Sequence, residues 1–196
     1  MELQPDIDPQ ETQEWLDALD SVITHAGGER AHFLLEKLIE KARKPIILCG
    51  HGVLMSKAEN ELMQFAVKTQ TPVASTLLGL GAFPASHELS LGMMGMHGEV
   101  HTNLAIQNSD LILAFGMRFD DRVTGTLKTY APRAKKIHIE IDPSEVHKNV
   151  AVDVPLVGDL KTVLSDLIPL VDEYDHEDWK QEINGWKSEA DKRSIM

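Results

Sequence analysis

Short apolar segments that alternate with amphipathic ones constrain the fold of this chain more than any other feature. The clearest apolar run is 110–115, and further runs stand at 45–49, 72–76, 136–141 and 154–157. Between them, apolar residues recur at helical spacing in 59–68, 103–108 and 160–170, and a long Gly- and Met-rich loop is expected from about 77 to 101. Strands that alternate with helices are typical of a parallel sheet covered on both faces. We therefore predict a three-layer, Rossmann-like α/β fold with five or six mostly parallel strands.

The acidic residues are concentrated at the two ends of the chain. The net charge of −12 divides into −6 for residues 1–43, −2 for 44–170 and −4 for 171–196. This division predicts a helical N-terminal segment, a central nucleotide-binding domain and an acidic, partly helical tail with solvated faces. In the first segment, apolar residues at helical spacing stand on both sides of Gly27-Gly28, which predicts a helical hairpin.

Composition excludes several classes of protein. No apolar run approaches the roughly 18 residues of a membrane span. The acidic balance disfavours binding to nucleic acid, which needs clustered Lys and Arg. The acidic N-terminus lacks the apolar region of a signal peptide, and Cys49, the single cysteine, allows no internal disulfide. We expect a cytoplasmic protein in which Cys49 is a buried thiol within a strand.

Glycines and charged side chains follow the predicted strands directly. They stand at 50–52, 76–77, 116–122, 140–142 and 158–159. Because doubly wound sheets bind ligands at the carboxyl ends of their strands, these segments should share one site. Glycines let a backbone approach a pyrophosphate, a strand-end carboxylate can bind ribose hydroxyls, and an arginine can pair with phosphate. The pattern predicts a nucleotide site.

Two catalytic alternatives have less support in the residues. Gly50 and Gly52 lack the third glycine of the dinucleotide fingerprint, because Met55 stands there, which weakens the case for a nicotinamide-dependent oxidoreductase. The spacing His97-x-Glu99-x-His101 differs from the His-Glu-x-x-His of zinc proteases, and we predict no metal site there.

Four motifs give the chain a family resemblance. They are PVASTLLGLG at 72–81, LGMMGMHG at 91–98, DLILAFGMRFDDRVTG at 110–125 and HIEID at 138–142. Residues 44–170 with these motifs resemble the central domain of the catalytic subunit of acetolactate synthase (acetohydroxyacid synthase). Members of that family condense two 2-oxo acids in branched-chain amino acid biosynthesis, using thiamine diphosphate and magnesium, and their central domain binds FAD.

The resemblance implies a set of FAD contacts in this chain, and it places Arg122 near the channel to the thiamine site. Position 51 is His where the family usually has a small residue, and position 140 is Glu where Asp is usual. The implied contacts are Gly50, His51, Gly52, Thr76, Leu77, Gly95, Met96, His97, Gly98, Gly116, Met117, Arg118, Phe119, Asp120, Glu140, Ile141 and Asp159.

The parts that bind thiamine diphosphate and magnesium in that family have no counterpart here. An N-terminal domain supplies a glutamate and a C-terminal domain supplies a Gly-Asp-Gly…Asn motif, whereas Gly158-Asp159 is followed by Leu160. Two domains of ordinary size do not fit into 43 and 26 residues. We therefore expect a fragment or chimera that is inactive alone, with its homo-oligomeric state open.

A second resemblance covers residues 6–43. The segments at 8–22 and 28–31 are similar to the N-terminus of the homodimeric decarboxylating subunit of pyruvate dehydrogenase. In that family the region docks the enzyme onto the acyltransferase core of its complex. The resemblance implies an alternative function for this chain, as an interaction module for such a core.

Overall fold

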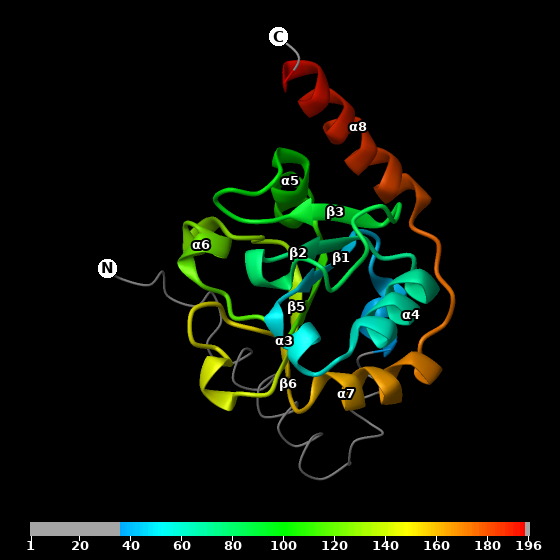
Figure 1. Cartoon of the computed structure of the whole chain (residues 1–196), viewed down its shortest axis with the longest axis vertical. Coiled ribbons are helices and arrows are strands. Elements are labelled where there is room, and N and C mark those ends of the chain that lie inside the picture. Colours follow the sequence, from blue (N-terminus) through cyan, green and yellow to red (C-terminus); the bar gives the residue numbers. More distant parts are fainter. Residues whose placement is uncertain (1–35, 195–196) are drawn as a thin grey trace.

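A six-stranded, all-parallel sheet forms the centre of the computed structural model, which describes residues 36–194 (Figure 1). The strand order is β3-β2-β1-β4-β5-β6, and every neighbouring pair is parallel. The strands are β1 (Pro45–Cys49), β2 (Val73–Ser75), β3 (Ser90–Met93), β4 (Leu111–Phe115), β5 (Lys135–Glu140) and β6 (Val154–Val157). The predicted α/β class is confirmed. The predicted helical hairpin lies outside the described residues, except that 36–41 are helical.

Helices cover both faces of this sheet, which is why β1 and β4 are apolar and buried along their whole length. On one face, α4 (Glu59–Thr69) and α7 (Leu160–Leu167) pack against a core that contains Phe65 and Phe115. On the other face, α5 (Val100–Asn108) and α8 (Glu177–Ser194) pack over a core that contains Ile46 and Trp179. Shorter helices follow β1 and β4, namely α3 (His51–Met55) and α6 (Asp121–Thr124).

One strand lies where a loop was expected. The segment 77–101 was predicted to lack regular structure, but it contains the short helix η1 (Leu77–Gly79) and the edge strand β3, so that prediction was wrong. The sequence of β3 is SLGM, with Leu91 as its one buried residue, and its pairing with β2 contains an irregularity between Val73 and Ala74. A four-residue edge strand with a central glycine has neither the alternation nor the apolar run that indicates a strand.

The acidic C-terminal segment forms a helix that packs on the sheet. Trp179 is 1% exposed, and its indole Nε1 donates a hydrogen bond to the Pro45 carbonyl at 3.0 Å. Ile183, one turn later, is also buried, whereas the Glu182 carboxylate pairs with Lys44 at 2.6 Å. The expectation of solvated faces therefore holds for only part of α8, because its apolar stripe anchors the helix to the start of β1.

Three glycines bring the turns after β1 and β4 into direct contact. A side-chain Cβ at Gly50 would lie 2.4 Å from the Gly116 carbonyl oxygen, and one at Gly52 would lie 2.6 Å from the Gly116 Cα. The amide of Gly50 donates to the Phe115 carbonyl, and that of Gly52 donates to the Gly116 carbonyl. Gly116 itself has φ +56°, which favours glycine. The sequence needs glycine here because backbone packs on backbone.

This contact predicts that replacing glycine by alanine has opposite effects on the free energy of unfolding at Gly50 and at Gly185. Gly50→Ala should lower the free energy of unfolding by about 2 kcal/mol or more, because the added methyl group has no room. Gly185→Ala should raise it by about 0.5–1 kcal/mol, because Gly185 is exposed within α8 with open space around it. Urea denaturation of both variants measures the difference. A Gly50→Ala variant as stable as the wild type would contradict the packing described.

Candidate functional site

A cleft of about 710 Å³ lies at the carboxyl ends of the strands. It opens where the strand order reverses, with β1 and β4 as neighbours and their connections leaving in opposite directions, which is where doubly wound sheets bind ligands. Its size is within the usual range for small-molecule sites. Its lining residues are Gly50, His51, Thr76, Leu77, Leu78, Met93, Met94, Met96, His97, Gly116, Met117, Arg118, Asp120, Arg122, Val123, Glu140, Asp142 and Glu145.

Most of the predicted contact residues come together in this cleft. They reach it from the ends of β1, β2, β4 and β5 and from the loop after β3. Those that line it are Gly50, His51, Thr76, Leu77, Met96, His97, Gly116, Met117, Arg118, Asp120 and Glu140.

Three predicted glycines shape the cleft walls without lining it. Gly52 packs on Gly116, as described above. A Cβ at Gly95 would lie 2.4 Å from the Arg122 carbonyl oxygen, and one at Gly98 would lie 2.4 Å from the Met93 carbonyl oxygen. Their role in the structure is close packing of backbone segments.

The remaining three predicted residues do not line the cleft. Phe119 is buried, with its ring against Tyr130 and His138. Ile141 is 68% exposed. Asp159 caps α7, where its carboxylate accepts a hydrogen bond from the Thr162 amide at 3.0 Å.

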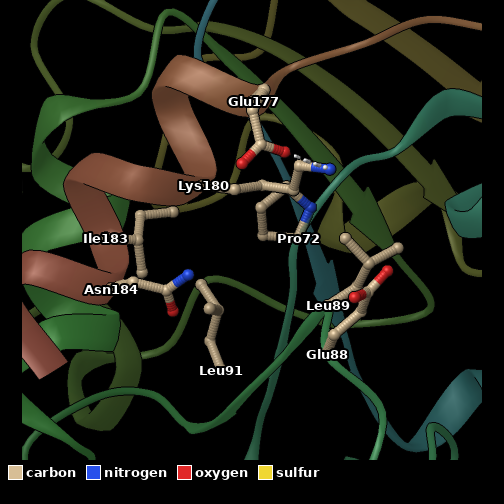
Figure 2. A pocket seen from close by; sticks show the side chains of 8 residues that line it. All are labelled: Pro72, Glu88, Leu89, Leu91, Glu177, Lys180, Ile183 and Asn184. Atoms are coloured by element: carbon tan, nitrogen blue, oxygen red, sulfur yellow. Dashed lines mark ion pairs between the residues drawn. The ribbon is translucent and has the colours of Figure 1, made fainter.

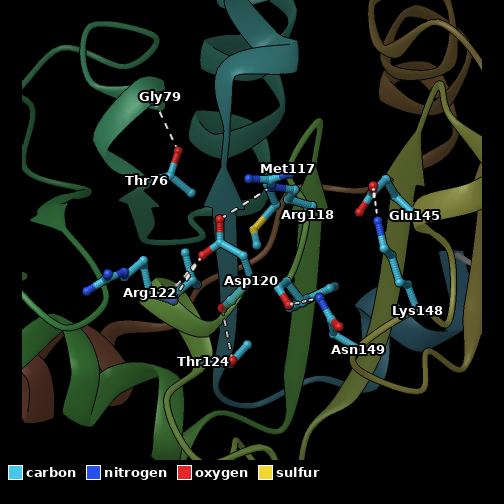
Figure 3. Close-up of polar contacts among 12 residues, drawn as sticks. Thr76, Gly79, Met117, Arg118, Asp120, Arg122, Thr124, Glu145, Lys148 and Asn149 are labelled. Atoms are coloured by element: carbon cyan, nitrogen blue, oxygen red, sulfur yellow. Dashed lines mark hydrogen bonds and ion pairs between the residues drawn. The ribbon is translucent and has the colours of Figure 1, made fainter.

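The segment after β4 presents a cation to the cleft. Arg118 Nε lies 3.4 Å from Asp120 Oδ2 (Figure 3). The other carboxylate oxygen of Asp120 accepts bonds from the Arg122 and Val123 amides and so caps α6. Asp120 therefore acts as a helix cap and as a partner for Arg118. The Arg118 side chain remains 65% exposed and available to an anion.

An acidic turn after β5, the strand next to β4, lines the same cleft. Glu140 Oε1 accepts hydrogen bonds from the amides of Ile141 at 2.9 Å and Asp142 at 3.3 Å. Hydrogen bonding from Ser144 lowers the pKa of Asp142 below its usual value, so this carboxylate is charged at neutral pH. The turn thus places carboxylates in the same cleft as Arg118, as a site for hydroxyl groups beside a phosphate requires.

Several lining residues were not predicted. Leu78, Met93 and Met94 stand within two of the family motifs but were not among the predicted contacts. Glu145 reaches the cleft, as does Asp142 of the predicted segment 140–142, because the chain turns sharply after β5, where Asp142 Oδ1 accepts a bond from the Ser144 amide. The Asp-Pro-Ser sequence at 142–144 is the one signal that could have indicated this turn.

The structure separates the histidines of the His-x-Glu-x-His motif. His101 is 5% exposed, and its Nε2 lies 3.1 Å from the Leu91 carbonyl oxygen. His97 lies at the surface, in the wall of the cleft. Among residues 36–194, no group of three or more His, Cys, Asp or Glu side chains could hold a metal ion.

Cys49 and the smaller hollow of Figure 2 lie outside this site. The Cys49 thiol is buried, as predicted, 3.1 Å from the Ser75 hydroxyl, and burial raises its pKa to about 11. The hollow, of about 110 Å³, lies between α8 and the start of β2, where Lys180 pairs with Glu177 at 3.1 Å (Figure 2). It is too small for a nucleotide.

Within residues 36–194, none of the helices has both the length and the apolar character that a membrane span requires.

The fold and the cleft agree with a family match that covers most of the chain. The family described as "Thiamine pyrophosphate enzyme, central domain" matches residues 35–167, and the chain belongs to this family. A second family, "Pyruvate dehydrogenase E1 component, N-terminal domain", matches residues 8–47. Both recognised resemblances are thereby confirmed.

Curated relatives carry the name that the motifs indicated. The acetolactate synthase large subunit of Haemophilus influenzae is 46% identical over 158 residues, which cover 78% of this chain and 28% of that protein. Acetolactate synthase of Mycobacterium avium is 52% identical over 135 residues, 69% of this chain and 22% of the relative. A probable acetolactate synthase large subunit of Methanocaldococcus jannaschii is 51% identical over 132 residues, 67% and 22%. The chain thus spans about a quarter of the length of these relatives.

Two buried histidines predict how the stability of the fold depends on pH. Burial lowers the pKa of His138 and of His176 below the ordinary value. The unfolded chain therefore takes up protons first as the pH falls below about 6.5, and the free energy of unfolding should fall between about pH 7 and pH 5. Above that range this contribution to stability is complete.

Urea denaturation of the wild type and of a His138→Gln, His176→Gln double variant measures this effect. The double variant should show a flatter dependence on pH over the same interval, because neither glutamine titrates. An equally steep loss of stability in both proteins would show that other groups cause it.

Proposed function

We propose that this chain is the FAD-binding central domain of a thiamine-diphosphate-dependent acetolactate synthase. The observation that carries the proposal is the cleft itself, since the glycines after β1 and β4 meet there beside Arg118 and Glu140. The family match and the names of the relatives support the same enzyme. On this proposal the chain takes part in branched-chain amino acid biosynthesis in the cytoplasm.

The residues present fit a flavin nucleotide. The cleft is lined by residues from the ends of four strands. Its exposed apolar side chains, Leu77, Leu78 and Met96, could pack against the flavin ring. Arg118 would hold the diphosphate through its guanidinium. Glu140 and Asp142 would accept hydrogen bonds from ribose hydroxyls. His51 and Glu140, which depart from the usual family residues, both line the cleft.

FAD takes no net redox part in the reaction of this family, so the work of these residues is binding and orientation. Thiamine diphosphate and magnesium would be held by parts that correspond to the remaining length of the relatives. We propose that the present chain binds the nucleotide but does not condense 2-oxo acids by itself. We also propose that the complete enzyme forms homo-oligomers.

Titration of the purified full-length chain with FAD, and with ADP for comparison, tests this function. Saturable binding of both is expected, because the ADP part would occupy the charged end of the cleft. Arg118→Gln should weaken binding about tenfold or more, since it removes a charged hydrogen-bonding partner of the diphosphate. NADH in the same assay should bind more weakly than FAD and should not be oxidised.

Arg133→Gln is the matched control, because Arg133 contacts Asn108 on the surface and does not line the cleft. It should leave the affinity for FAD unchanged. A folded chain that binds neither FAD nor ADP would refute the proposed function, and equal losses in both arginine variants would refute the assigned site.

We propose a second function because residues 8–47 match the N-terminal domain of a pyruvate dehydrogenase component. Through this segment the chain would dock to the acyltransferase core of such a complex. A pull-down with purified acyltransferase core, comparing the full chain with residues 44–196, tests it. Binding of both forms, or of neither, would argue against docking through this segment.

A further inference from the structure

The extended segment after β4 is held from inside the protein on both sides of Arg118. Met117 and Phe119 are 4% and 3% exposed, whereas the Arg118 side chain is 65% exposed. The backbone therefore alternates, with Met117 and Phe119 packed in the core and Arg118 exposed in the cleft, which the buried Met117 also borders. Interactions that hold the backbone at residues 117 and 119 therefore also set the direction in which the Arg118 side chain points.

The carbonyl groups on either side of Arg118 accept hydrogen bonds from two side chains that do not line the cleft. His138 Nε2 lies 2.7 Å from the Met117 carbonyl oxygen, and Asn149 Nδ2 lies 2.8 Å from that of Phe119. The Phe119 ring also meets the imidazole edge-on, with centroids 5.2 Å apart. The segment is thus clamped through its backbone, independently of the side chains that face a ligand.

We propose that His138 is a positioning residue of the cleft, whose buried imidazole holds the Met117 carbonyl and thereby aims Arg118. A carbonyl oxygen can only accept, so Nε2 carries a proton. Burial lowers the pKa of His138, so the ring is neutral at neutral pH and Nδ1 is unprotonated. Nδ1 is buried and has no hydrogen-bond partner within residues 36–194. A buried polar atom without a partner lowers the stability of the fold, so its presence calls for an explanation. The hydrogen bond from Nε2 to the Met117 carbonyl is the one that this side chain makes.

A leucine at the same place would fill a similar volume without the orphaned nitrogen. Residue 138 lies on β5 beside Ala114 of β4, and its ring lies against Phe119, both members of the α5 and α8 core, while Glu140, Glu145 and His147 are near enough to act on its charge. Packing alone therefore gives no reason for histidine, whereas the hydrogen bond to the β4 exit segment does. The inference rests on the proposed function for the ligand of Arg118, but the clamp itself can be tested without a ligand.

The first test uses the full-length chain without nucleotide. Amide ¹⁵N relaxation should show increased fast motion at residues 118–120 in His138→Leu and restored order in His138→Gln, whose amide can still donate at the ε position. Ile139→Val, on the opposite face of the same strand, should destabilise the fold without this local change. Should His138→Leu not fold, His138→Asn replaces it, because its shorter side chain cannot reach Met117. Unchanged order at 118–120 in the folded variant overturns the proposal.

The second test asks whether His138 acts through Arg118. We expect His138→Leu to weaken ADP binding about tenfold and His138→Gln by less than about threefold. In an Arg118→Gln background, His138→Leu should add less than about twofold, because coupled residues are not additive. A full additional loss in that background overturns the proposal. A wild-type chain that binds neither FAD nor ADP refutes the proposed function instead, and the relaxation measurement then decides the role of His138.

Discussion

The contact between the turns after β1 and β4 is the constraint on which the rest of the site depends. Gly52 donates to the Gly116 carbonyl, and Gly116 donates in turn to Ile139 on β5, so a chain of backbone bonds crosses three strands. Because the β1 and β4 connections leave the sheet in opposite directions, their turns form the floor of the cleft. A side chain at any of these glycines would push the two turns apart and so change the shape of the cleft.

The sequence predicted the centre of this fold better than its margins, for a physical reason. β1 and β4 are buried on both faces, so their sequences are uninterrupted apolar runs with nearly the observed bounds. β3 lies at the edge, and its SLGM sequence becomes a strand only because β2 offers unpaired backbone groups. The acidic character of α8 likewise concealed Trp179, whose burial depends on a partner more than 130 residues away in sequence.

The candidate site divides in the same way between what local sequence can and cannot indicate. Residues at strand ends, such as Arg118 and Glu140, were predictable because every parallel strand delivers its end to one edge. Gly95 and Gly98 were included with them, but their close backbone contacts arise from a loop conformation that no spacing reveals. His138 carries no signal, because within an alternating strand it is indistinguishable from an ordinary core position until the 2.7 Å bond to Met117 is seen.

The two family matches overlap within elements that belong to the central sheet. The overlap, residues 35–47, includes the helical residues 36–41 with the fully buried Ile39 and the start of β1. This is the amino-terminal edge of the sheet, where α8 holds Pro45, whereas the cleft lies at the carboxyl edge. A five-residue strand separates the two edges by about 15 Å. Residues 36–41 and the start of β1, which the second family match also covers, therefore lie at the edge of the sheet away from the cleft.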